Sequence, residues 1–135
     1  MTYEEFQKQY EVESDKVFAE LSSLSEDALL KIIGDKGEGR YKIWKGQDNY
    51  QIWRAIGENG TENSIQPLFE IVSDLGNEYL VRYHACTALF QIAKLGDEDF
   101  KGQVQYGLDK NRQAVDQRQA ILKLQEILKS KFPQL

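Results

Sequence analysis

The sequence predicts an all-α protein, and three observations support that prediction. Only two prolines, Pro67 and Pro133, occur in 135 residues, so helices are rarely interrupted. Glycines separate stretches in which apolar residues recur at intervals of three and four, the spacing of one helix face. Residues that commonly cap helices precede most of these stretches. The length is also that of a single domain.

At the start of the chain, the pattern predicts a helix over residues 3–24. Thr2 followed by Glu5 fits a capping box, in which two side chains bond to backbone N–H groups at a helix start. Ser25 is expected to cap a short second helix, with Gly34 in the position after its end, where a left-handed conformation is common.

Four glycines in residues 34–47 predict a loop or a short hairpin. Asp48 can cap the next helix, which is expected to end in a turn from Gly57 to Gly60. Further helices are predicted over about 62–75, 78–95, 98–109 and 112–131. Their expected caps are Thr61 or Ser64, Asn77, Asp97 and Asn111, and the glycines expected to close two of them are Gly76 and Gly96.

The last four predicted helices form a repeat. A shift of 35 residues superimposes apolar residues, namely Ile65 on Phe100, Phe69 on Val104, Ala85 on Ala120, Leu89 on Leu124 and Ile92 on Ile127. Helix pairs that recur at this interval are typical of an α-solenoid, in which each pair buries its apolar face against its neighbours.

Two short strings carry a family resemblance. Residues 55–60 (AIGENG) and 65–68 (IQPL) resemble the inter-repeat turn and first helix of HEAT-like repeats, and residues 77–92 resemble the second helix. The second copy lacks the proline of the first. The resemblance implies a right-handed α-solenoid of HEAT-like helical hairpins over 48–131, with residues 1–47 as a divergent N-terminal cap.

The predicted helix over 78–95 has two apolar faces. At about 100° per residue, one face gathers Val81, Ala85, Ala88, Leu89 and Ile92. The opposite face carries Tyr79, Tyr83 and Phe90, with Cys86 alongside. Either neighbouring helices or the N-terminal cap cover this second face, or its aromatic residues line the inner surface of the solenoid and anchor a partner. The second helices of HEAT-like repeats line that surface, which supports the anchoring role, and both alternatives stay open.

The glycine-rich loop carries Tyr41 and Trp44 among lysines, in a β-like alternation. Trp44 either folds back onto the core or, with Tyr41 and the nearby Tyr50, belongs to a recognition arm that contacts a partner. The glycines match neither of the common phosphate-binding patterns, so a phosphate cradle is rejected.

The charge balance excludes some classes of partner. The chain carries 17 Lys and Arg residues and 22 Asp and Glu residues, and residues 1–64 hold 13 of the acids and only 8 of the bases. Because nucleic-acid affinity comes largely from neutralising phosphates, a net charge of −5 argues against a nucleic-acid partner. The sequence contains neither an apolar span nor a signal-peptide pattern, so we expect no membrane partner and a cytoplasmic location.

Few residues are candidates for chemistry. The single histidine, His84, excludes a two-histidine metal site, and it lies only two residues from the single cysteine, Cys86, which is too close along a helix for a nucleophilic dyad. The acidic run at 97–99 lacks the spacing of a calcium loop and is expected to cap a helix. Carboxylate pairs stay open, but the sequence favours no particular pair. We therefore expect no cofactor, no metal and no catalytic residue.

The sequence thus predicts a non-catalytic protein-binding module. A small, acidic helical-repeat chain is similar in kind to bacterial immunity proteins, which neutralise a cognate toxin that is often a basic nuclease. In this hypothesis Tyr79, Tyr83 and Phe90 anchor the toxin domain, while Glu58 and Glu62 meet its basic residues. The alternatives are a HEAT-repeat adaptor or assembly factor and, by analogy with other HEAT-like proteins, a bilin-lyase-like enzyme.

Overall fold

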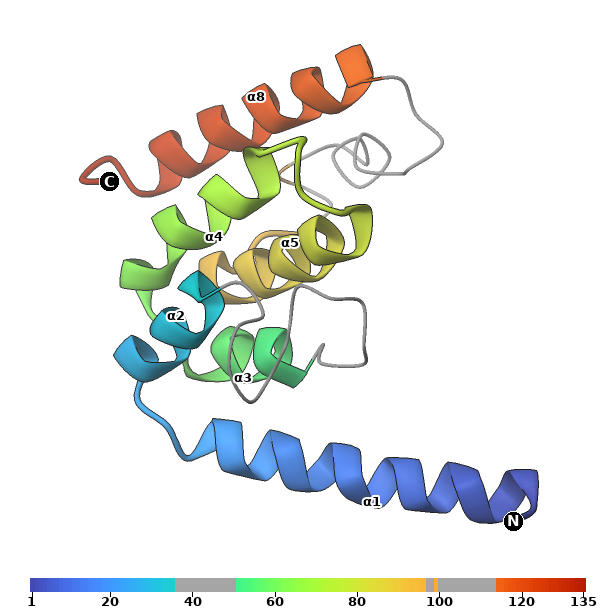
Figure 1. Cartoon of the computed structure of the whole chain (residues 1–135). Helices are drawn as coiled ribbons and strands as arrows, with labels where there is room; N and C mark the ends of the chain where they lie inside the picture. Colours follow the sequence, from blue (N-terminus) through green and yellow to red (C-terminus); the bar gives the residue numbers. More distant parts are fainter. Residues whose placement is uncertain (36–50, 97–98, 100–113) are drawn as a thin grey trace. The chain divides into compact units, whose positions relative to one another are not determined.

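The computed structural model describes residues 1–35, 51–96, 99 and 114–135 (Figure 1). The chain divides into two compact units, Met1–Gly60 and Thr61–Leu135. All regular secondary structure among the described residues is helical, which confirms the all-α prediction. The predicted caps Asp48, Asp97 and Asn111 lie outside the described residues, as do the loop from residue 36 onward and, apart from Asp99, the predicted helix over 98–109.

The first unit begins with α1 (Tyr3–Ser22) and α2 (Glu26–Gly34). Both predicted N-caps are confirmed, because the hydroxyl of Thr2 accepts a hydrogen bond from the Glu5 N–H at 3.1 Å and that of Ser25 accepts one from the Ala28 N–H at 3.2 Å. The predicted role of Gly34 is wrong. Gly34 is the last helical residue, and Asp35 ends the helix in a right-handed conformation, with its N–H directed back to helix carbonyls, so no left-handed residue is required.

The third helix, α3 (Gln51–Asn59), packs against α1 and α2 and supplies much of the core of the first unit. The fully buried side chains of this core include Leu21, Leu29, Ile52 and Ile56. The predicted turn from Gly57 to Gly60 begins later than expected. Gly57 is buried inside α3, and the Gly60 N–H still donates to the Ile56 carbonyl at 2.7 Å, so packing outweighs the weak helix preference of glycine.

The second unit contains a short 3-10 helix, η1 (Glu62–Ser64), and the helices α4 (Ile65–Ser73), α5 (Tyr79–Ala93) and α8 (Ala114–Lys131). The helix predicted over 62–75 is therefore a 3-10 turn followed by a shorter α-helix. Of the two predicted caps, Thr61 is the one whose side chain forms a capping hydrogen bond, since its hydroxyl accepts from the Asn63 N–H at 3.3 Å. Pro67 lies in the first turn of α4, where a missing N–H costs no helix hydrogen bond.

The core of the second unit forms where α4 packs against α5 and α8. Its largest fully buried apolar side chains are Ile65, Leu68, Val72, Leu89 and Leu124. Each comes from the apolar face that helical spacing predicts, so burial of these faces accounts for the association of the three helices.

In the connection between α4 and α5, neither Asn77 nor Gly76 has the capping role that was predicted for it. Asn77 is not the N-cap of α5, because its side-chain amide instead donates to the Ile71 carbonyl at 3.1 Å, and Glu78 occupies the cap position. Gly76 does not close α4 directly. The helix ends at Ser73, and the carboxylate of the next residue, Asp74, accepts from the Gly76 N–H at 2.9 Å. The turn is thus held by two side-chain hydrogen bonds to the backbone.

The end of α5 is also different from the prediction. Lys94, and not Gly96, has the left-handed conformation that terminates the helix, with φ 56° and ψ 45°. The Leu95 N–H then donates to the Phe90 carbonyl at 3.0 Å, which satisfies one of the carbonyls left free at the helix end. A residue with a Cβ is strained in this conformation, so the hydrogen bonds of the turn impose it on Lys94.

Candidate functional site

One face of α5 lies in the core, as predicted. Val81, Ala85, Ala88 and Leu89 are buried, and Ile92 is half-buried. The opposite face differs from the expected pattern at one residue. Cys86, expected beside the aromatic residues, is buried with the core.

The exposed side of α5 carries a small aromatic and apolar cluster. Tyr83 is 49% exposed and Leu80 is 60% exposed, while Tyr79 and His84 are half-buried beside them. The Tyr79 and Tyr83 rings lie 6.1 Å apart between centroids, and the Tyr83 and His84 rings meet edge to face at 5.5 Å. We call Tyr79, Leu80, Tyr83 and His84 the α5 surface.

Two members of the α5 surface were missed by the sequence analysis. In the sequence, Leu80 lies between Tyr79 of one apolar face and Val81 of the other, so it was assigned to neither face. It lies three residues before Tyr83, which is close enough for the two side chains to share one side of the helix. His84 was considered as a metal ligand and as a partner for Cys86, and not as part of a binding surface. Phe90, which was included, is half-buried and lies nearly two turns farther along the helix.

The ionisable groups of α5 are poorly suited to nucleophilic chemistry. Burial raises the pKa of the Cys86 thiol to about 12, although the charge of Arg82 acts in the opposite direction. The thiol is therefore protonated at neutral pH and is not a nucleophile. Partial burial lowers the pKa of His84 below its usual value, so its imidazole is neutral at pH 7.

A buried arginine fixes the position of α5. Arg82 is only 4% exposed, and it donates from Nε to the Val72 carbonyl of α4 at 3.1 Å and from Nη1 to Oε1 of Gln117 in α8 at 2.9 Å. Burial lowers the pKa of Arg82, and the charges of Cys86 and Asp74 oppose this shift. The side chain thus joins three helices and holds the α5 surface on a rigid support.

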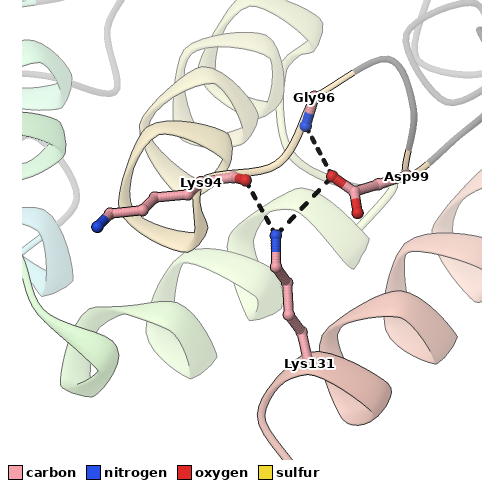
Figure 2. A network of polar contacts seen from close by, with 4 residues as sticks. All are labelled: Lys94, Gly96, Asp99 and Lys131. Carbon is pink, nitrogen blue, oxygen red and sulfur yellow. Dashed lines mark hydrogen bonds and ion pairs between the residues drawn. The ribbon is translucent and has the colours of Figure 1, made fainter.

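A second polar network joins the end of α5 to the end of α8. Figure 2 shows Lys131 of α8, whose Nζ donates to the Lys94 carbonyl at 3.0 Å and lies 3.9 Å from Oδ2 of Asp99. The same carboxylate oxygen accepts from the Gly96 N–H at 2.8 Å. The backbone carbonyl exposed by the strained residue Lys94 is therefore satisfied from a neighbouring helix.

The other predicted site residues fall in different places. Tyr41, Trp44 and Tyr50 lie outside the described residues. Glu58 is exposed on α3 in the first unit and pairs with Arg54 at 3.8 Å. Glu62 is exposed in the second unit, where its Oε2 accepts from the Gln134 side chain at 2.9 Å. Within the second unit, the described structure brings together Tyr79 and Tyr83 but does not add Phe90 to their cluster.

No family model, curated protein or solved structure matches this chain. The resemblance to HEAT-like repeats accordingly stays a prediction. In the part of the chain that the structure describes, no group of three or more metal-ligating side chains occurs, and no helix has both the length and the apolar character needed to cross a membrane.

Proposed function

We propose that this chain is a non-catalytic protein-binding module and that the α5 surface is its docking site. The observation that carries the proposal is the exposure of Leu80 and Tyr83 on a helix whose other face is core. Exposed apolar side chains gathered on one face mark interaction sites more often than isolated ones do.

The chemistry of the α5 surface supports binding to protein. Tyrosine combines a large contact area with few rotatable bonds and a hydroxyl that can form hydrogen bonds, so it is frequent among residues that dominate interface energies. Tyr79 and Tyr83 already lie against each other, and Arg82 holds their helix in place. A partner therefore has little conformational entropy to remove from this surface when it binds.

The neighbouring ionisable groups support the non-catalytic part of the proposal. The Cys86 thiol is buried and its pKa is raised to about 12, and the pKa of His84 is lowered by burial. A nucleophile needs a lowered pKa or an adjacent base, and the environment of Cys86 acts in the opposite direction.

We also propose that the second unit belongs to a HEAT-like solenoid. Two of the pairs related by 35 residues have similar environments, since Leu89 and Leu124 are both fully buried and Ile92 and Ile127 are both half-buried, whereas Ala85 is buried and Ala120 is half-buried. Arg82 and Gln117 are likewise 35 residues apart and bond to each other. Contacts between equivalent positions are expected where successive repeats stack side by side.

Within the binding class, we propose the role of an immunity protein that blocks a basic toxin domain. The excess of acidic residues in 1–64 supports it, because negative charge attracts a basic partner and increases its association rate. The role of adaptor or assembly factor is the alternative. Coexpression with a toxin encoded beside this gene distinguishes the two, since an immunity protein restores growth and an adaptor does not.

The docking site is tested with a Leu80→Ser/Tyr83→Ser double variant. Captured from a lysate of the source cells, a specific partner should be recovered by the wild-type chain and lost with the double variant. The purified complex should weaken by at least about 2 kcal/mol, roughly thirtyfold in Kd.

Leu122→Ser is the matched control, because Leu122 is an exposed leucine on α8 of the same unit. It should bind the partner as the wild type does. Equal affinity of the double variant and the control would contradict the proposed docking site, provided that circular dichroism shows both variants to be folded.

A further inference from the structure

Helix α1 carries an apolar stripe, and the described residues cover only part of its length. Tyr3, Phe6, Val17 and Leu21 recur at helical spacing on one face. The last turns of this face are packed: Leu21 is fully buried, Ser14 accepts a hydrogen bond from the Gln51 side chain at 2.6 Å, and the Arg54 guanidinium lies 3.8 Å above the Phe18 ring.

The first turns of α1 are different. Tyr3 is 77% exposed and Phe6 is 58% exposed. The nine residues of α3 extend about 14 Å, whereas the twenty residues of α1 extend about 30 Å, so α3 is too short to cover the whole stripe. Figure 1 shows the N-terminal end of α1, in dark blue, extending past α3 within the first unit.

The charged residues of α1 give this exposed end a net negative charge. The helix contains six acidic residues and two lysines. Glu4, Glu11 and Glu13 are exposed within about two turns of Phe6. At about 100° per residue, Lys8 falls on the side opposite Tyr3 and Phe6 and about 40–60° from Glu4 and Glu11, so the glutamates outnumber the lysine on these turns. We call Tyr3 and Phe6, with these three glutamates, the α1 surface.

We infer that the α1 surface docks an amphipathic helix of another protein, with an apolar face bordered by lysine and arginine. The aromatic pair would contact the apolar face of that helix, and the glutamates would attract its basic borders. Pairing of two copies of α1 is disfavoured, because it would place acidic residues of both copies together. This surface lies in the first unit and does not depend on the α5 surface.

The small area of the α1 surface limits the affinity that we expect for the helix bound to it. Two aromatic side chains bury about 150–250 Å² each, well below the roughly 800 Å² per partner of a stable complex. The contact should therefore be weak, with a Kd on the order of micromolar, and should depend on its electrostatic part.

The experiment uses the full chain and two synthetic helical peptides, read by fluorescence anisotropy. Both peptides carry the same leucine stripe, bordered by lysine and arginine in one and by glutamate in the other. We expect the wild-type chain to bind the basic peptide and not the acidic one, and to lose about tenfold in affinity between low and high salt. Tyr3→Ala/Phe6→Ala should lower the affinity at least about tenfold.

Two further variants make the test specific. Val12→Ala is the matched control, because Val12 is exposed on another face of the same helix, and it should bind as the wild type does. Replacing Glu4, Glu11 and Glu13 with lysine should transfer binding from the basic to the acidic peptide. This variant keeps the aromatic pair, so it tests the charge argument even if the aromatic variants unfold.

Three outcomes would overturn the inference. They are failure of the wild-type chain to bind the basic peptide, equal binding by the Tyr3/Phe6 and Val12 variants, and a concentration-dependent dimer that the Phe6 substitution abolishes. Leu80→Ser/Tyr83→Ser should leave peptide binding unchanged. Failure of the α5 docking site can thereby be told apart from failure of the α1 surface.

Discussion

Arg82 donates a hydrogen bond to the side chain of Gln117, a residue 35 positions later in the chain and on a different helix. The same arginine also donates to the Val72 carbonyl, so one buried side chain joins α4, α5 and α8. Polar atoms that are buried without a partner are costly, and Arg82 supplies a hydrogen bond to each of these two acceptors.

Arg82→Met is predicted to lower the free energy of unfolding by about 1–3 kcal/mol, because it keeps much of the buried aliphatic volume but removes both donors. Urea denaturation measures this change. Arg118→Met on the exposed side of α8 is the control and should change stability by no more than about 0.5 kcal/mol. Equal stability of the two variants would show that the Arg82 hydrogen bonds do not stabilise the fold.

Lys94→Gly is predicted to raise the free energy of unfolding by about 0.5–1 kcal/mol. The left-handed conformation at φ 56° strains any residue with a Cβ, and this relief exceeds the entropy that glycine adds to the unfolded chain. The carbonyl that accepts from Lys131 is retained in the variant. Thermal unfolding should also show no gain for Lys94→Ala, and a loss of stability in the glycine variant would contradict the prediction.

Ser25→Ala is predicted to destabilise the first unit by about 1 kcal/mol, since it removes the acceptor for the Ala28 N–H at the start of α2. Hydrogen exchange of the α2 amides measures the effect. Thr2→Ala removes an equivalent acceptor from the exposed start of α1 and should cost less, because terminal turns already fray. A larger loss of stability in Thr2→Ala than in Ser25→Ala would contradict this prediction.

Cys86 is predicted to make the protein less stable in alkali. Burial raises the thiol pKa from 9.0 to about 12 in the folded state, so between these values the unfolded chain releases a proton that the folded chain retains. Stability is then fully present below pH 9 and falls as the pH rises, by at most about 1.4 kcal/mol per pH unit.

The measurement for Cys86 is urea denaturation at several pH values, compared with Cys86→Ala. Other groups also titrate in this range, so the difference between the two curves isolates the thiol. The alanine variant should be less stable at pH 8 because of the cavity, and the gap should narrow as the pH rises. If the difference in the free energy of unfolding between the two proteins stays constant with pH, the pKa of Cys86 is not raised in the folded state.

Local sequence signals predicted much of the fold. Thr2 and Ser25 were identified as caps because the hydroxyl and the amide that it accepts from are only three residues apart. The core face of α5 was likewise predicted, since helical spacing alone groups Val81, Ala85 and Leu89.

The features that were missed depend on distant parts of the chain. Arg82 falls on the buried side of its helix, but its burial depends on acceptors in α4 and α8 that no local pattern reveals. Glycine preference pointed to Gly96 as the end of α5, whereas tertiary hydrogen bonds support the left-handed turn at Lys94. Cys86 lies at the border between the two faces of α5, where spacing does not decide burial.

The burial of Cys86 has a practical consequence. It is the only cysteine in the sequence, so every thiol-modifying reagent has a single target in the native protein. Because that target is covered, modification must wait for the surrounding helices to separate. The rate at which a reagent labels the unmodified chain therefore reports how often the second unit opens, without an engineered probe.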